Sequence, residues 1–205
     1  EWEHTANFIQ YFSSNVRLAK GSCVAAKTRM IAGITSAMAE YNGISEANHV
    51  KNKITDMIID ANIGYGCATA ASKLAWKHPS GVYFPEIVVG NAGLYNTRLR
   101  FIHHLGVIHE IAGGIVDTMP LEADFKSEKT GKIVEILLKG KNGTSAEERY
   151  RMLQVVQDLT GSHMTGHMFG NVICAGGTPE TNRVEIARNF DLKKYHDHAK
   201  VLAKI

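Results

Sequence analysis

The sequence predicts an all-α fold, and three observations support this. Apolar residues recur at three- and four-residue steps over long stretches, whereas the alternation typical of half-buried strands is almost absent. Gly, Pro and Asn-Gly breaks divide these stretches into five or six helices with short connections. The 205 residues contain no evident linker and are enough to bury a substantial core. We therefore expect residues 1–205 to form a single helical-bundle domain.

The longest amphipathic signal predicts a first helix over residues 17–42, near the centre of the bundle. Asn42-Gly43 suits a left-handed C-cap, which predicts the end of this helix. Residues 1–15 carry several aromatic side chains among polar positions, so we expect an entry segment that docks on the core. The apolar residues that share one face of the first helix are Val24, Ile31, Ile34, Met38 and Tyr41.

Two further helices are predicted before Pro120. Ser45 is a suitable N-cap for a second helix that extends to about Lys77, with a kink or a close backbone approach at Gly64 and Gly66. Residues 77–81 break the pattern. A third helix opens at Phe84-Pro85-Glu86 and extends to about Asp117. Its Gly113-Gly114 pair indicates tight packing against a neighbour or a cofactor.

The last third of the chain predicts a short helix and two longer ones. Residues 121–143 form a polar connection with a short helix near 133–138. Thr144 and Glu147 match a capping box, which predicts the start of the fourth main helix. A last helix follows the turn at residues 175–179 and carries Val184, Ile186, Ala187 and Leu192 on its apolar positions.

Composition excludes several function classes. The balance of 23 basic and 20 acidic residues, without a dense basic run, argues against nucleic-acid binding. No apolar run reaches membrane-spanning length, so we expect no membrane segment. Three widely separated cysteines are typical of a reducing compartment, and we expect a cytoplasmic protein. The chain lacks an initiator Met, which suggests the C-terminal piece of a longer protein.

Cysteine and histidine offer candidate ligands. Cys23 falls in the first turn of the predicted first helix, where unpaired backbone N–H groups favour a thiolate. Two interpretations stay open: Cys23 is a nucleophile or metal ligand, or it is a small buried apolar side chain. His104 and His109 are five residues apart, off the shared face of a HExxH site. His163 and His167 share a face, but the segment offers no further ligands, so we expect them to face solvent or a partner.

The turn before the last helix is a candidate anion site. Gly176 and Gly177 allow backbone N–H groups to approach an anion at the helix N-terminus. Thr178 follows as a cap, and Arg183 supplies a counter-charge one turn later. Such Gly-rich turns also occur with no role beyond turning the chain, so the pattern alone leaves both interpretations open.

Several runs resemble one enzyme family over essentially the whole chain. They are RLAKGSC, AEYNG, HVKNKITDMI, EIAGGIVDTMPLEADFKS, TSAEERYRML and AGGTPETNRVEIAR. The chain is similar to the C-terminal part of the 4-hydroxybutyryl-CoA dehydratase / vinylacetyl-CoA isomerase family and, more distantly, to the 4-hydroxyphenylacetate 3-hydroxylase family. Both resemble acyl-CoA dehydrogenase-like flavoproteins. The resemblance implies a C-terminal helical bundle that binds FAD and builds a homotetramer, with the family's N-terminal helical and middle β domains absent from this chain.

The resemblance also assigns site residues. Gly176, Gly177, Thr178 and Arg183 correspond to the turn that contacts FAD, and Arg17 is a further FAD-binding candidate. Cys23 matches a ligand of the dehydratase family's [4Fe-4S] cluster, but Val16 stands at the position of its His ligand. Because an isopropyl group cannot ligate iron, we expect FAD without a dehydratase-type cluster. At the positions of other active-site residues the chain carries Lys20, Val24 and, near the last turn, Asn171.

The resemblance implies a flavin-dependent enzyme, a lyase/isomerase or an oxidoreductase. The first hypothesis is action on a small substrate, an acyl-CoA thioester, together with the N-terminal part of the same protein. The second is an aromatic hydroxylase that uses reduced flavin and oxygen, which the missing His ligand favours. The third is a non-catalytic helical assembly subunit. The catalytic residues and the substrate stay open at this level.

Overall fold

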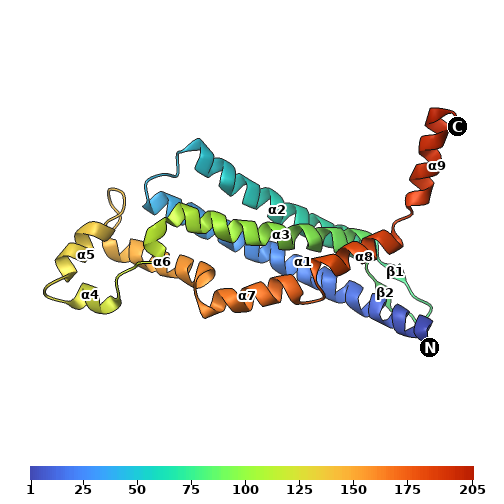
Figure 1. Cartoon of the computed structure of the whole chain (residues 1–205), viewed down its shortest axis with the longest axis horizontal. Coiled ribbons are helices and arrows are strands. Elements are labelled where there is room, and N and C mark those ends of the chain that lie inside the picture. Colours follow the sequence, from blue (N-terminus) through green and yellow to red (C-terminus); the bar gives the residue numbers. More distant parts are fainter.

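The computed structural model describes all residues 1–205 and is an elongated bundle of helices (Figure 1). Helices account for 77% of the chain, and the two strands contain two residues each. The predicted all-α fold class is therefore confirmed. The chain has nine α-helices, more than the five or six expected, because several of the predicted segments are divided by short turns.

Three long helices form the trunk of the molecule. They are α1 (Trp2–Tyr41), α2 (Asn48–Lys73) and α3 (Ile87–Ala112), and they pack along one another over most of their length. The buried face of α1 carries Val24, Ile31 and Met38, as its periodicity predicts. The helix ends at Tyr41, and Gly43 has a φ of 73°, so the C-cap prediction is confirmed.

Helix α1 begins far earlier than predicted. Residues 2–16 continue the helix without a break, because neither Gly nor Pro interrupts them. The predicted docking segment is wrong for most of its side chains: Trp2 is 78% exposed and Phe8 69%. Cys23 consequently lies in the middle of a 40-residue helix, so the argument that placed it among unpaired N–H groups at a helix start is also wrong.

A small hairpin connects α2 with α3. Its strands, β1 (Trp76–Lys77) and β2 (Tyr83–Phe84), are antiparallel and pair Trp76 with Phe84. Helix α2 starts after Ala47 rather than Ser45 and ends at Lys73, four residues before the predicted end. The hairpin packs on α1 through Tyr11, whose ring centre lies 4.6 Å from that of Phe84. The hairpin therefore holds the connection between α2 and α3 beside the N-terminal part of α1 (Figure 1).

Helix α3 is defined by a cap at each end. Glu86 is its N-cap, and its carboxylate accepts hydrogen bonds from the N–H groups of Val88 and Val89. Gly113 ends the helix with a φ of 83°, and η1 (Gly114–Val116) follows. The expected extension to Asp117 is wrong, and within this chain the Gly113-Gly114 pair does not pack tightly against a neighbour. A side chain at either glycine would meet no neighbour, so Gly113 serves the turn rather than a close contact.

The second half of the chain forms shorter helices along the trunk. The capping box of α6 is Ser145 with Glu148, one residue later than predicted, because the hydroxyl of Ser145 accepts from the Glu148 N–H. The expected last helix is split into α8 and α9. The elements are α4 (Glu122–Lys126), α5 (Gly131–Leu138), α6 (Ala146–Thr160), α7 (His163–Cys174), α8 (Pro179–Asn189) and α9 (Leu192–Ala203).

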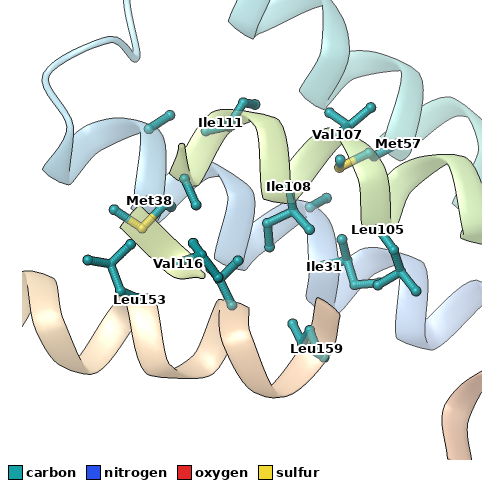
Figure 2. Close-up of a cluster of buried hydrophobic side chains, with 14 of the residues drawn as sticks. Ile31, Met38, Met57, Leu105, Val107, Ile108, Ile111, Val116, Leu153 and Leu159 are labelled. Atoms are coloured by element: carbon teal, nitrogen blue, oxygen red, sulfur yellow. The ribbon is translucent and has the colours of Figure 1, made fainter. Parts of the chain in front are cut away.

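The hydrophobic core lies where α6 covers the C-terminal halves of α1 and α3. Figure 2 shows Ile31 and Met38 of α1 against Ile108 of α3, with Leu153 and Leu159 of α6 closing the opposite side. Burial of such side chains contributes roughly 1.5–3 kcal/mol each. None of the helices is both long and apolar enough for a membrane crossing.

Candidate functional site

A buried arginine organises the turn between α7 and α8. Arg98 of α3 is completely buried, and its guanidinium donates hydrogen bonds to the carbonyl oxygens of Ala175 and Gly177, the latter at 2.7 Å. It also donates to Oδ1 of Asn182 at 2.8 Å. Burial, followed by the charge of Arg17, lowers the pKa of Arg98 to about 10, so the group remains charged at neutral pH.

The third carbonyl of the turn is held by Arg17. Its Nε donates to the Gly176 oxygen at 2.9 Å, and its Nη1 lies 3.9 Å from Oε1 of Glu185. Burial lowers the pKa of Arg17, and the charge of Glu185 raises it by less. Glu185 is the single carboxylate that pairs with either guanidinium. Two buried cations with one acidic partner leave this region positively charged.

The turn itself requires glycine. Gly176 and Gly177 have φ values of 82° and 96°, in the left-handed region that other residues rarely adopt. A side chain at Gly177 would overlap Oγ1 of Thr181, and one at Gly176 would lie 3.2 Å from Cγ1 of Val16. Both the backbone conformation and the close approach of α1 therefore exclude a side chain from this turn.

The two arginines orient the turn so that two of its backbone N–H groups can donate hydrogen bonds to a ligand. Because the carbonyl oxygens of residues 175–177 are bound to Arg17 and Arg98, they point into the protein. The N–H groups of Gly176 and Thr178 have no hydrogen-bond partner within the chain. Two buried guanidinium nitrogens, Nη1 of Arg17 and Nε of Arg98, also lack a hydrogen-bond acceptor. These unpaired donors at the start of α8 are the groups that bind phosphates in proteins.

The start of α8 is tied to α3 by two amides. Asn182 is fully buried, and its Nδ2 donates to Oδ1 of Asn91 at 2.8 Å. Because Asn182 also accepts from Arg98, it links α3 and α8 directly. A chain of paired polar groups of this kind holds a helix in one position against its neighbour.

The structure brings Arg17, Gly176 and Gly177 together, whereas the other two predicted residues lie at the edge of the turn. Thr178 is the N-cap of α8, but its side chain makes no capping hydrogen bond. The guanidinium of Arg183 is exposed, stacks 5.1 Å from the centre of the Tyr95 ring and lies 3.6 Å from Glu180. The predicted FAD roles of these residues stay predictions.

The surroundings of Cys23 do not form a cluster site within this chain. The thiol is exposed on α1, and the side chain of Val16 packs toward Gly176. No three His, Cys, Asp or Glu side chains lie close enough together to hold a metal ion. His163 and His167 are exposed, while His104 is buried and bonds Oδ2 of Asp60 at 3.0 Å. A cluster bound at Cys23 would need its remaining ligands from outside residues 1–205.

Arg98, Asn91 and Asn182 were not predicted as site residues. One signal for Arg98 was present in the sequence: it lies four residues after Leu94 and three before Phe101, on the apolar face of α3. A basic residue on a buried helix face needs acceptors for its donors, which makes it a candidate site residue. The acceptors themselves are backbone carbonyls of a distant turn, and no residue pattern identifies them.

Comparison with known proteins identifies relatives that match most or all of the chain. The chain is 27% identical over 215 residues to the 4-hydroxybutyryl-CoA dehydratase/vinylacetyl-CoA-Delta-isomerase of Clostridium aminobutyricum, covering 100% of this chain and 44% of that protein. It is 28% identical over 159 residues to the 4-hydroxyphenylacetate 3-monooxygenase oxygenase component of Geobacillus sp. (strain PA-9), covering 73% and 32%. The chain thus spans less than half the length of these relatives.

Solved structures share the fold. An oxygen-tolerant 4-hydroxybutyryl-CoA dehydratase from N. maritimus superposes with a TM-score of 0.92 at 26% identity, over 100% of this chain and 41% of that one. The oxygenase component HpaB, complexed with FAD and 4-hydroxyphenylacetate, gives a TM-score of 0.79 at 22% identity, over 88% and 37%. The second match demonstrates the fold alone. Both confirm the predicted likeness to the C-terminal bundle of these flavoproteins.

One family model covers nearly the whole chain. It is described as HpaB, 4-hydroxyphenylacetate 3-hydroxylase C terminal, and it matches residues 5–204. The resemblance inferred from the sequence runs is thereby confirmed. The chain belongs to the 4-hydroxyphenylacetate 3-hydroxylase C-terminal family.

Proposed function

We propose that residues 1–205 are the FAD-binding and oligomerisation portion of a flavoenzyme. The observation that carries this proposal is the turn at residues 175–178, where Arg17 and Arg98 bind three carbonyls and leave amide N–H groups unpaired. Bound FAD would supply the redox or radical chemistry, and these residues would hold its diphosphate or adenosine part. The remaining domains of the relatives would complete the active site.

The test is the flavin content of the full-length protein that contains this chain. We expect a flavin absorption spectrum in the purified protein and loss of most of the flavin in Arg17→Met, because Arg17 contributes both charge and an unpaired donor to the turn. Arg151→Met is the matched control, since Arg151 is exposed and pairs only with Glu147. A protein that folds and carries no flavin would contradict the proposal and favour a non-catalytic assembly subunit.

For the substrate we propose an acyl-CoA thioester, converted by dehydration, isomerisation or dehydrogenation. Support comes from the dehydratase of C. aminobutyricum, 44% of whose length aligns with the whole of this chain. A dehydratase of that type would carry a cluster at Cys23. Iron and acid-labile sulfide analysis of anaerobically purified, full-length protein tests this point.

The second proposal is an aromatic hydroxylase that uses reduced flavin and oxygen. It is supported by the family model and by Val16, which offers no ligand atom at the position of the dehydratase family's His ligand. We expect FAD without a dehydratase-type cluster, and Cys23→Ser should leave flavin content and folding nearly unchanged because the swap is close to isosteric. About four irons per chain, lost in Cys23→Ser, would instead assign the protein to the dehydratase type.

A further inference from the structure

A carboxylate, an imidazole and a hydroxyl lie in series where α6 ends beside α3. The imidazole belongs to His109 in the last turn of α3, and its Nδ1 lies 3.0 Å from Oγ1 of Thr160, the last residue of α6. Its Nε2 lies 3.3 Å from Oδ2 of Asp117, which directly follows η1. A hydroxyl is therefore within hydrogen-bond distance of a base that a third group orients, which is the arrangement of an activated nucleophile.

The hydrogen-bond partners determine the direction of proton transfer. A carboxylate only accepts hydrogen bonds, so Asp117 favours the tautomer of His109 that carries its hydrogen on Nε2. Nδ1 then presents a lone pair to Oγ1 of Thr160. The single hydroxyl hydrogen of Thr160 has two acceptors within reach, this nitrogen and the carbonyl oxygen of Val156 at 2.8 Å. Rotation about the Cβ–Oγ bond moves the hydrogen from the carbonyl to the imidazole.

His109 and Thr160 line a cleft of about 280 Å³ between α3, α6 and α7. The side of the cleft formed by α3 is open at Gly106, where an added Cβ would meet no atom within 4 Å. Both His109 and Thr160 are half-buried, so solvent and a small molecule can reach them. This volume suits a small molecule with a short apolar part. The apolar lining consists of Ile102, Leu105 and Phe169.

We propose that Thr160 is a nucleophile that accepts an acyl group from a short-chain carboxylic ester, with His109 as general base and Asp117 as its positioning residue. Oγ1 of Thr160 bonds to the carbonyl carbon while Nδ1 of His109 takes the hydroxyl proton. The bond from that carbon to the alkoxy oxygen breaks, and the alcohol leaves with the proton. Water, deprotonated by His109, then cleaves the acyl-threonine, and the carboxylic acid leaves as Thr160 regains its hydrogen.

This activity is independent of the flavin proposal. The cleft and its three polar residues share no residue with the turn at residues 175–178. The reaction needs only the ester and water, because no atom is oxidised or reduced. Failure of one proposal therefore leaves the other standing, and flavin content and ester cleavage are measured separately.

The experiment uses 4-nitrophenyl acetate with the full-length protein that contains this chain. We expect release of 4-nitrophenol and an acetyl group on Thr160, located by peptide mass mapping after an acid quench. Thr160→Val, which is close to isosteric, should abolish this label, and His109→Gln should slow the release by about a hundredfold. Thr69→Val is the matched control, because the exposed Thr69 hydroxyl also donates to the carbonyl four residues earlier but has no imidazole beside it.

Two variants of Asp117 separate positioning from folding. The side-chain amide of Asp117→Asn can donate to Nε2, which would move the imidazole hydrogen to Nδ1 and leave no base beside Thr160. The release should then slow by about a hundredfold at an unchanged melting temperature. Asp117→Glu keeps a carboxylate and should recover part of the rate. Acetyl groups found only on lysine or cysteine side chains, a wild-type rate in Thr160→Val, or equal rates in the two Asp117 variants would overturn the proposal.

Discussion

Arg98 is the residue on which the site geometry depends most directly. It is fully buried, and its hydrogen-bond acceptors are uncharged: two backbone carbonyls and the side chain of Asn182. Arg98→Met would keep the apolar stem and leave those acceptors unpaired in the interior. We expect the free energy of unfolding to fall by about 3 kcal/mol, measured by urea denaturation. The exposed Arg151→Met should change it by less than about 1 kcal/mol, and similar losses in the two variants would contradict this account.

His104 gives the protein a defined pH response. Burial lowers its pKa, and the adjacent Asp60 raises it by less. The unfolded chain therefore binds a proton near pH 6.5 that the folded chain resists, so stability falls as the pH decreases below about 6.5. Urea unfolding between pH 8 and pH 5 should show this decrease, and His104→Gln should reduce its slope. His167→Gln, at an exposed position, should retain the wild-type slope.

At the scale of elements, Gly64 sets the distance between α2 and its neighbours. A methyl group at Gly64 would overlap Cγ2 of Thr97 in α3 and lie 3.3 Å from Cβ of Ala25 in α1. Gly64→Ala should destabilise the protein by about 1–3 kcal/mol through overpacking. Gly66→Ala, two residues later and without a neighbour within 4 Å, should stabilise α2 by about 0.5–1 kcal/mol.

A second variant tests whether the contact with Thr97 is the cause. Thr97→Ser removes Cγ2 and retains the hydroxyl that donates to the carbonyls of Gly93 and Leu94. Gly64→Ala combined with Thr97→Ser should therefore recover most of the thermal stability lost in Gly64→Ala. If the losses of the two single variants add in the double variant, the overlap with this methyl group is not the cause of the destabilisation in Gly64→Ala.

At the scale of the whole molecule, α9 suggests how copies associate. Figure 1 shows α9 projecting away from the bundle, and none of its residues is buried. Leu192, Tyr195 and Leu202 are exposed on it. The small residues Ala68 and Ala71 of α2 offer no contact area to another copy, because they are buried within the chain. We still propose a homotetramer, with α9 rather than these alanines supplying contact area between copies.

Light scattering of the full-length protein tests the assembly. We expect a tetramer. Removal of residues 191–205 should reduce the number of copies in the assembly, because the apolar face of α9 would be lost. Circular dichroism should show that the trunk helices persist, since α9 contributes nothing to their core. A wild-type monomer would contradict the tetramer, and a tetramer that survives the truncation would remove α9 from the interface.

The sequence by itself determined the helical architecture. Apolar periodicity identified the buried face of α1, and Asn42-Gly43 marked its end. These features are local, because a helix face and a cap depend on residues within a few positions of one another. Boundaries were less certain where no Gly or Pro occurs, as in residues 2–16, since continuation of a helix there depends on weak propensities.

Only the tertiary structure decided which groups meet at the site. Arg17 reaches a carbonyl 159 residues away, and Arg98 reaches one 77 residues away. The sequence identified Gly176-Gly177 as a turn and Arg17 as a candidate, but a backbone carbonyl has no residue-specific signal. Packing of α3 against α8 and of α7 along the trunk sets these contacts. A buried donor without an acceptor costs more free energy than local helix propensity contributes. The buried arginines therefore pair with acceptors that are distant in the sequence, which local patterns cannot specify.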